Sequence, residues 1–380
     1  MNKYASDHFA KAFYDQHYYA KDVLPLRYRE GMTPEERKQW QKALKGKITE
    51  LMAFPDTMYD MPVVNLLKSK QRFGYRVEKY EISPEPNLWA TFLMLIPDKA
   101  SEENKTAGVL CLPGGRWTKE ALCGEDFCDL EYDPPQPVGG IAHRYYYANM
   151  QAVHYAQAGM TAIACEDIGV GEHKGAFEPG DLEKLLIGQG RSMMGVTVEL
   201  RIAMIKWLKT RPFVDIERIA ISGHSLGVDS AMLAVTLDED IKAFVYNDYV
   251  CDWQAEISAM CPPEKLPCIW WHMYSGVYKW YTYPDLLAAF APRKLFVTEG
   301  GKTEYLEKIA KSYAECGAPE NFRYDYYREY QDPANRKYEN EPLPRGCTVE
   351  EMMERCNVVP EKHFFKFEQA VPWLAEALKF

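Results

Sequence analysis

A serine in the pentapeptide Gly-His-Ser-Leu-Gly, residues 223–227, is the clearest candidate for chemistry in this chain. Residues 218–222 before it are short and largely apolar, which predicts a strand, and residues 230–235 after it predict a helix. A sharp strand-to-helix turn raises a serine hydroxyl above the sheet, where a base can reach it, and aims the next N–H at a developing oxyanion. Glycines two residues before and after the serine relieve the crowding of such a turn. We therefore predict that Ser225 is a nucleophile rather than an ordinary helix cap.

The composition excludes several other classes of function. With 380 residues, of which 47% are hydrophobic, the chain can form one large α/β domain with a substantial core. A formal net charge of −10 argues against nucleic acid and anionic membranes as partners. No apolar run has the length of a membrane span, and the first residues lack the apolar region of a signal peptide. We expect a cytoplasmic protein, or one from which a signal was removed.

Short apolar runs alternate with helical patterns over most of the chain. Strands are predicted at residues 75–83, 87–96, 107–112, 161–165, 219–222, 241–246, 294–298 and 322–327. Helices are predicted at residues 143–158, 192–209, 302–315 and 364–378. This alternation predicts an α/β fold with a mostly parallel sheet of about eight strands and helices on both faces.

The chain is expected to divide into an N-terminal helical extension, residues 1–70, and a main domain, residues 71–380. Within the extension, Thr33 followed by Pro, Glu and Glu forms a capping box, which predicts a helix that runs to about Met52.

Four stretches, found in the same order along the chain, carry a resemblance to a known family. They are LCLPGG at 110–115, DIGVG at 167–171, TRPFVDIERIAISGHSLG at 210–227 and APRKL at 291–295. With them the chain resembles α/β-hydrolases, and among these the bacterial esterases related to acetyl xylan esterases and dienelactone hydrolases. The resemblance runs from about residue 75 to the end. It implies the α/β-hydrolase fold with inserted cap loops, and a serine esterase that needs no cofactor.

The resemblance also implies a catalytic triad in the chain order serine, acid, histidine. After Ser225 only two histidines follow, His272 and His363. His363 comes after the last predicted strand and just before the closing helix, where the family keeps its base. We therefore expect His363 to be the base, and we regard His272, in an aromatic-rich segment, as the weaker candidate.

The acid is where the chain departs from the family pattern. The family usually has an aspartate after the seventh strand, whereas residues 299–304 here read EGGKTE and contain none. Glu304 lies at a suitable position if glutamate replaces aspartate, so we predict Glu304 as the acid. The alternatives are Glu299, and Asp248 or Asp252 after the preceding strand.

The oxyanion hole is expected to use backbone N–H groups on both sides of the serine. One is that of Leu226, and the other comes from the loop after residue 112, at Gly115 or Arg116. Pro113 occupies the place of the family's usual histidine.

Residues 250–290 form a cap segment rich in tryptophan and tyrosine. Long connections of this kind often shape a binding site, so we expect Trp270 and Trp280 to contact substrate, although core packing explains such rings equally well. Nothing in the sequence requires a metal ion.

Together these inferences predict a serine hydrolase that cleaves a carboxylic ester through an acyl-enzyme. The family resemblance and the aromatic segment favour a small-molecule or carbohydrate ester as substrate, and an acylated carbohydrate in the first place. The alternatives are a peptidase, a lactone or thioester hydrolase, and a catalytically silent hydrolase fold used for binding. The sequence specifies neither the acyl and alcohol groups nor the oligomeric state.

Overall fold

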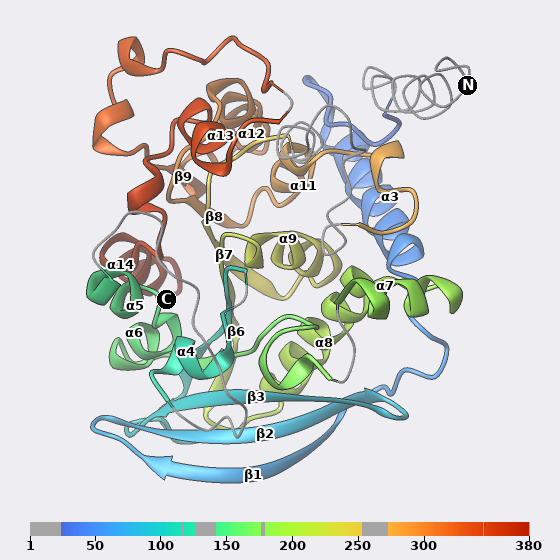
Figure 1. The fold of residues 1–380 in the computed structure, drawn as a ribbon, viewed down its shortest axis with the longest axis vertical. Coiled ribbons are helices and arrows are strands. Elements are labelled where there is room, and N and C mark those ends of the chain that lie inside the picture. Colours follow the sequence, from blue (N-terminus) through green and yellow to red (C-terminus); the bar gives the residue numbers. More distant parts are fainter. Residues whose placement is uncertain are drawn as a thin grey trace, which may run out of the picture.

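A single mixed sheet of nine strands organises the part of the chain that the computed structural model describes, which is residues 24–115, 117–125, 142–175, 179–252, 273–344 and 346–379. The strand order is β1-β2-β3-β5-β4-β6-β7-β8-β9 (Figure 1). The first three strands, which pair antiparallel, are β1 (Val63–Gln71), β2 (Tyr75–Glu85) and β3 (Leu88–Pro97). The other six, which pair parallel with one another, are β4 (Thr106–Leu112), β5 (Thr161–Ala164), β6 (Val214–His224), β7 (Ile241–Asn247), β8 (Lys294–Val297) and β9 (Phe322–Tyr324).

The eight strands expected from the sequence are confirmed as β2 to β9, and β1 is an addition. Its sequence, VVNLLKSKQ, does not alternate cleanly between apolar and polar residues, and a register shift falls between Leu66 and Lys68. Most of its side chains are exposed, because β1 is an edge strand and has only β2 beside it. A sequence pattern reports burial, so a strand without a buried face leaves little signal.

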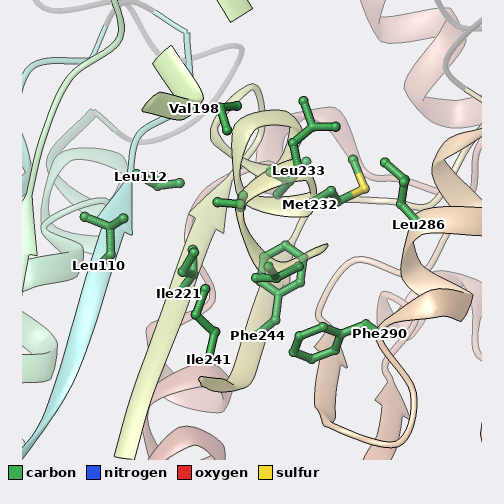
Figure 2. Packing of buried hydrophobic residues seen from close by; sticks show 14 of the residues in the cluster. Leu110, Leu112, Val198, Ile221, Met232, Leu233, Ile241, Phe244, Leu286 and Phe290 are labelled. Carbon is green, nitrogen blue, oxygen red and sulfur yellow. The ribbon is translucent and has the colours of Figure 1, made fainter. Parts of the chain in front are cut away.

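Alternate side chains of each strand point to opposite faces of the sheet, and a hydrophobic cluster lies on each face. Leu110 and Leu112 of β4 join one hydrophobic cluster, whereas Val109 and Cys111 join another. The first cluster is shown in part in Figure 2. Its helices are α3 (Pro34–Met52), α8 (Met193–Leu208), α9 (Gly227–Leu237), α11 (Tyr283–Ala289) and α12 (Thr303–Glu315).

The helices of the opposite face are α4 (Lys119–Cys123), α6 (Gln151–Gln157) and α14 (Phe367–Ala377), with α5 (Ala142–Ala148) just before α6. The helix expected at residues 143–158 is thus divided between α5 and α6. Asn149 lies at the division, and its side chain accepts a hydrogen bond from the Phe365 N–H at 2.8 Å. Two further helices, α7 (Pro179–Gly188) and α13 (Val349–Arg355), lie in long connections.

Helix α3 begins as the sequence predicts. The Thr33 hydroxyl accepts from the Glu36 N–H, and the Glu36 carboxylate accepts from the Thr33 N–H at 2.8 Å. Its buried apolar side chains recur every four residues, which places one face of the helix against the core that α8 and α9 also cover. They are Trp40, Leu44, Ile48 and Met52.

No helix within the described ranges has the length and apolar character needed to cross a lipid bilayer.

Candidate active site

Ser225 occupies the sharp turn between β6 and α9. Its φ is +49°, a left-handed conformation that a serine adopts only where the surrounding structure imposes it. The two glycines of the motif permit the turn. A Cβ on Gly227 would lie 2.6 Å from the Pro113 carbonyl oxygen, and one on Gly223 would lie 3.0 Å from the Gly227 backbone. The strained strand-to-helix turn that the sequence predicts is therefore present.

The loop after β4 passes directly beside this turn. A Cβ added to Gly114 would lie 3.2 Å from the Cβ of Ser225, a tight contact that glycine avoids. The following residue, Gly115, lies near the side chain of Leu226, 3.9 Å from the position of an added Cβ. The structure thus places Gly115 beside the Leu226 side chain, and the role of their N–H groups as an oxyanion hole stays a prediction. Arg116, the other candidate donor, lies outside the described residues.

His363 lies between the last strand and α14, in contact with a buried carboxylate. Its Nδ1 is 2.6 Å from Oε2 of Glu299, whose side chain is fully buried. The opposite ring nitrogen, Nε2, is also buried and has no hydrogen-bond partner. The ring centroid of His363 lies 4.9 Å from that of His224, the residue that precedes Ser225. This imidazole is therefore oriented by an acid at one nitrogen and has the other available, close to the serine turn.

The carboxylate that contacts His363 is Glu299, and not Glu304, which the sequence favoured as the acid. Glu304 is exposed in the first turn of α12, whereas Glu299, named as an alternative, makes the hydrogen bond. The difference arises in the two glycines between them. The Val250 N–H donates to the Gly300 carbonyl at 2.8 Å, and a Cβ on Gly301 would lie 2.3 Å from the Val250 oxygen. This contact turns the chain away from His363 before α12 begins.

Of the two aspartates proposed after β7, Asp248 reaches the same place. A carboxylate oxygen of Asp248, a carboxylate oxygen of Glu299 and a ring nitrogen of His363 all lie within 4.8 Å of one another. Asp252 is buried but does not belong to this group. The imidazole of His363 therefore faces two carboxylates, of which Glu299 makes the direct hydrogen bond.

Electrostatics keep Glu299 ionised. Burial alone would raise its pKa, but the ammonium of Lys366 and the imidazole of His363 hold that pKa well below its usual range. For His224, burial and the positive charge of His363 lower the pKa to about 3, so this ring is neutral at physiological pH. Its Nδ1 lies 2.9 Å from the side-chain amide of Asn247, which fixes the ring below the serine turn.

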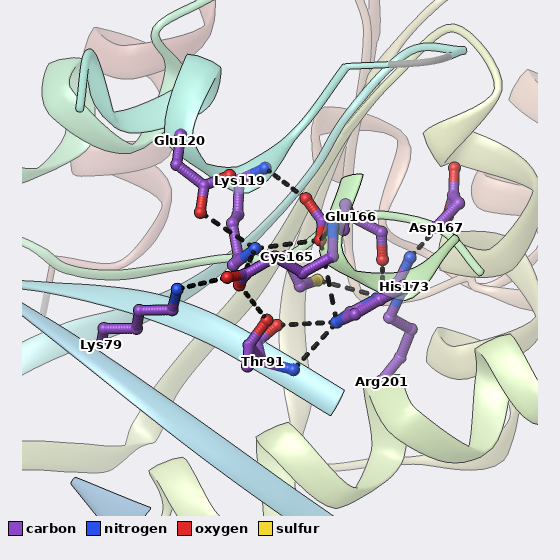
Figure 3. A network of polar contacts seen from close by, with 10 residues as sticks. Lys79, Thr91, Lys119, Glu120, Cys165, Glu166, Asp167, His173 and Arg201 are labelled. Carbon is purple, nitrogen blue, oxygen red and sulfur yellow. Dashed lines mark hydrogen bonds and ion pairs between the residues drawn. The ribbon is translucent and has the colours of Figure 1, made fainter. Parts of the chain in front are cut away.

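A buried network of charges anchors the far end of the loop that follows β4 (Figure 3). Lys119, the first residue of α4, is fully buried, and its Nζ contacts three carboxylates. The distances are 2.9 Å to Glu166, 2.8 Å to Glu172 and 3.0 Å to Glu120. Because Glu166 and Glu172 follow β5, these ion pairs fix the start of α4 against the neighbouring loop. This network left no signal in the sequence, since its members come from separate elements.

The aromatic cap segment is described only in part. Trp270 and the alternative base His272 lie outside the described residues. Trp280 is half-buried and packs against α3, with the Nζ of Lys47 3.9 Å from its ring centroid. Tyr281 is fully buried in the core. For these two rings packing is observed, and a contact between Trp280 and substrate stays a prediction.

A small, mostly apolar cavity of about 20 Å³ lies beside the serine turn. Leu226 and Ser230 line it from the start of α9, and Ile168 lines it from the loop after β5. Met193 and Met194 close it at the start of α8. A space of this size admits one small group.

Comparison with known proteins agrees with this geometry. The sequence profile of the Abhydrolase family matches residues 8–376. A Bacteroides fragilis protein, provisionally described as an acetyl xylan esterase, has a crystal structure that is similar with a TM-score of 0.83. It shares 31% sequence identity, over 97% of this chain and 96% of its own. A comparison with curated protein sequences finds no match.

More distant structures share the fold alone. A glucuronoyl esterase from Solibacter usitatus has a TM-score of 0.55 and 13% identity, over 78% of this chain and 86% of its own. A promiscuous esterase from a marine bacterial metagenome has a TM-score of 0.54 and 12% identity, over 90% of this chain and 93% of its own.

The family match spans nearly the whole chain, and the structural relative at 31% identity covers almost all of it. The described strand order and the serine turn after β6 agree with both findings. The chain therefore belongs to the Abhydrolase family and has the α/β-hydrolase fold.

Proposed function

We propose that this protein is a serine esterase that removes a short acyl group, acetyl in the first place, from a carbohydrate. The observation that carries the proposal is the pairing of a strained serine turn with a nearby histidine. Ser225 has a positive φ, and the buried Nε2 of His363 is unpaired while its Nδ1 is bonded to Glu299. Such a nucleophile and an oriented base are the parts that acyl transfer requires.

The reaction proceeds in two halves that use the same groups. Ser225 Oγ attacks the acyl carbon as its proton passes to Nε2 of His363. The Glu299 carboxylate stabilises the imidazolium, and the Leu226 N–H stabilises the oxyanion. The tetrahedral intermediate collapses as His363 gives its proton to the departing sugar oxygen, which leaves an acyl-enzyme. Water, deprotonated by His363, then attacks the acyl carbon. Collapse releases the carboxylic acid and returns the proton to Ser225.

No hydrogen bond joins Ser225 to Nε2 of His363 in this structure. Such contacts are often long without substrate and tighten when it binds, so their absence here does not oppose the mechanism.

Two findings support the choice of substrate. The cavity beside Leu226 has a volume of about 20 Å³, which suits a methyl-sized acyl substituent next to the oxyanion donor. The relative at 31% identity is provisionally described as an acetyl xylan esterase. An acetylated sugar combines a short acyl group with a carbohydrate alcohol.

The direct test is covalent labelling followed by turnover. A fluorophosphonate probe should phosphonylate Ser225, as mapped by peptide mass spectrometry, and Ser225→Ala should abolish the adduct. The same variant should lose several orders of magnitude in kcat on acetylated xylo-oligosaccharides with an unchanged Tm. Ser101→Ala, at a loop serine remote from the turn, is the matched control and should retain both labelling and turnover.

Absence of labelling on the folded wild-type protein would instead favour a catalytically silent binding fold. Hydrolysis of p-nitrophenyl butyrate or longer esters as fast as the acetate would contradict the short-acyl assignment.

A further inference from the structure

Lys366 links Glu299 and His363, the proposed acid and base of the site. Its Nζ lies 2.6 Å from Oε1 of Glu299, while Oε2 of the same carboxylate lies 2.6 Å from Nδ1 of His363. The side chains of Lys366 and His363 are mostly buried and that of Glu299 is fully buried. A buried carboxylate is thus held from one side by an ammonium and from the other by the imidazole.

The same ammonium also holds the backbone turn that carries the histidine. Nζ of Lys366 donates to the Phe364 carbonyl at 2.8 Å and to the Lys362 carbonyl, which are the carbonyls on either side of His363. The Lys366 backbone is itself fixed, because its N–H donates to Oδ1 of Asn247 at 2.7 Å. One side chain therefore sets the position of the acid and of the base together.

From this geometry we infer that Lys366 is a positioning residue of the esterase: it holds Glu299 and His363 in register for proton transfer from Ser225. The inference rests on the proposed function. Neither a triad nor a serine turn requires a lysine at this place, and the ion pair joins residues that lie far apart along the chain.

Lys366 also has an electrostatic effect that a structural brace would lack. Its positive charge offsets part of the negative charge of Glu299, which otherwise favours the imidazolium of His363. The other titratable groups that face this imidazole are Asp248 after β7, His224 of β6 and the phenol of Tyr249, while the phenol of Tyr327 lies beside Glu299. None of these carries a positive charge at neutral pH that could replace that of Lys366.

The test is Lys366→Met, which removes the charge and leaves an unbranched side chain one heavy atom shorter. We expect a loss of about 10- to 100-fold in kcat, with KM changed by less than about threefold. The acidic limb of the kcat/KM profile should move up by about one pH unit, because the uncompensated Glu299 stabilises the imidazolium. Lys366→Arg keeps the charge and should leave that limb in place.

Lys362→Met is the matched control. It removes a lysine from the same turn whose side chain pairs with Glu329 at the surface, so its profile should match the wild type. If Lys366→Met does not fold, Lys366→Gln retains a donor for the two carbonyls and should show the same shift of the acidic limb.

Wild-type kcat in Lys366→Met, or a loss that is equal at every pH, would overturn the inference. The proposed function fails separately: in that case the wild-type protein itself shows neither fluorophosphonate labelling nor ester turnover.

Discussion

Glu299→Gln is the substitution that most directly tests the arrangement around His363. The glutamine would retain the size of the side chain and lose the charge that faces the imidazole. The 2.6 Å contact between Oε2 and Nδ1 places the two charge centres about 4 Å apart, where an effective dielectric constant of about 20 gives about 4 kcal/mol. This stabilisation is realised only when His363 becomes an imidazolium, so it belongs to the transition state. We therefore expect kcat to fall by about three orders of magnitude, with little change in KM.

The assay is steady-state hydrolysis of an acetyl ester, together with the rate of fluorophosphonate labelling, which needs the same base. Glu304→Gln is the matched control: it removes the same charge five residues away, from an exposed side chain, and should behave as the wild type. A near-inactive Glu304→Gln protein would refute the reasoning. So would a Glu299→Gln protein that keeps more than about one tenth of wild-type kcat with normal folding.

Three other perturbations have outcomes that the structure predicts. Asp248→Asn should lower kcat less than about tenfold and move the acidic limb of kcat/KM to lower pH. The substitution removes a second negative charge near His363 and leaves the hydrogen bond between His363 and Glu299 in place. A loss of kcat as large as that predicted for Glu299→Gln would make Asp248 the acid. Lys119→Met should lower the free energy of unfolding by about 3–5 kcal/mol in urea titrations, because it leaves three carboxylates without their shared partner, and a change below about 1 kcal/mol would contradict this. The contribution of His173 and His224 to stability should fall as the pH drops below 6.5: burial lowers their pKa from 6.5 to about 3, so the unfolded chain binds protons at these two residues that the folded chain does not, at a cost of about 2 kcal/mol each by pH 5. His173→Gln should remove about half of this dependence, and an unchanged slope would show that the ring is not held neutral.

Local patterns in the sequence determined much of this protein. The strands β2 to β8 were predicted because each has buried apolar side chains, and burial is what such a pattern records. The turn at Ser225 was predicted because its geometry is set within five residues, by glycines that tolerate close backbone contacts. The helix α3 was predicted because its capping box lies within its own first turn.

The tertiary structure decided which distant groups meet. The sequence favoured Glu304 over Glu299 as the acid, but the contact of Gly300 and Gly301 with Val250 directs Glu299 toward His363 and Glu304 to the surface. The contact between Lys366 and Glu299 likewise forms because the turn before α14 packs against the end of β8. An edge strand such as β1 depends on one neighbour and buries too little to leave a pattern. Contacts between segments far apart in the chain depend on how the sheet and its connections pack, and no local window of sequence contains that information.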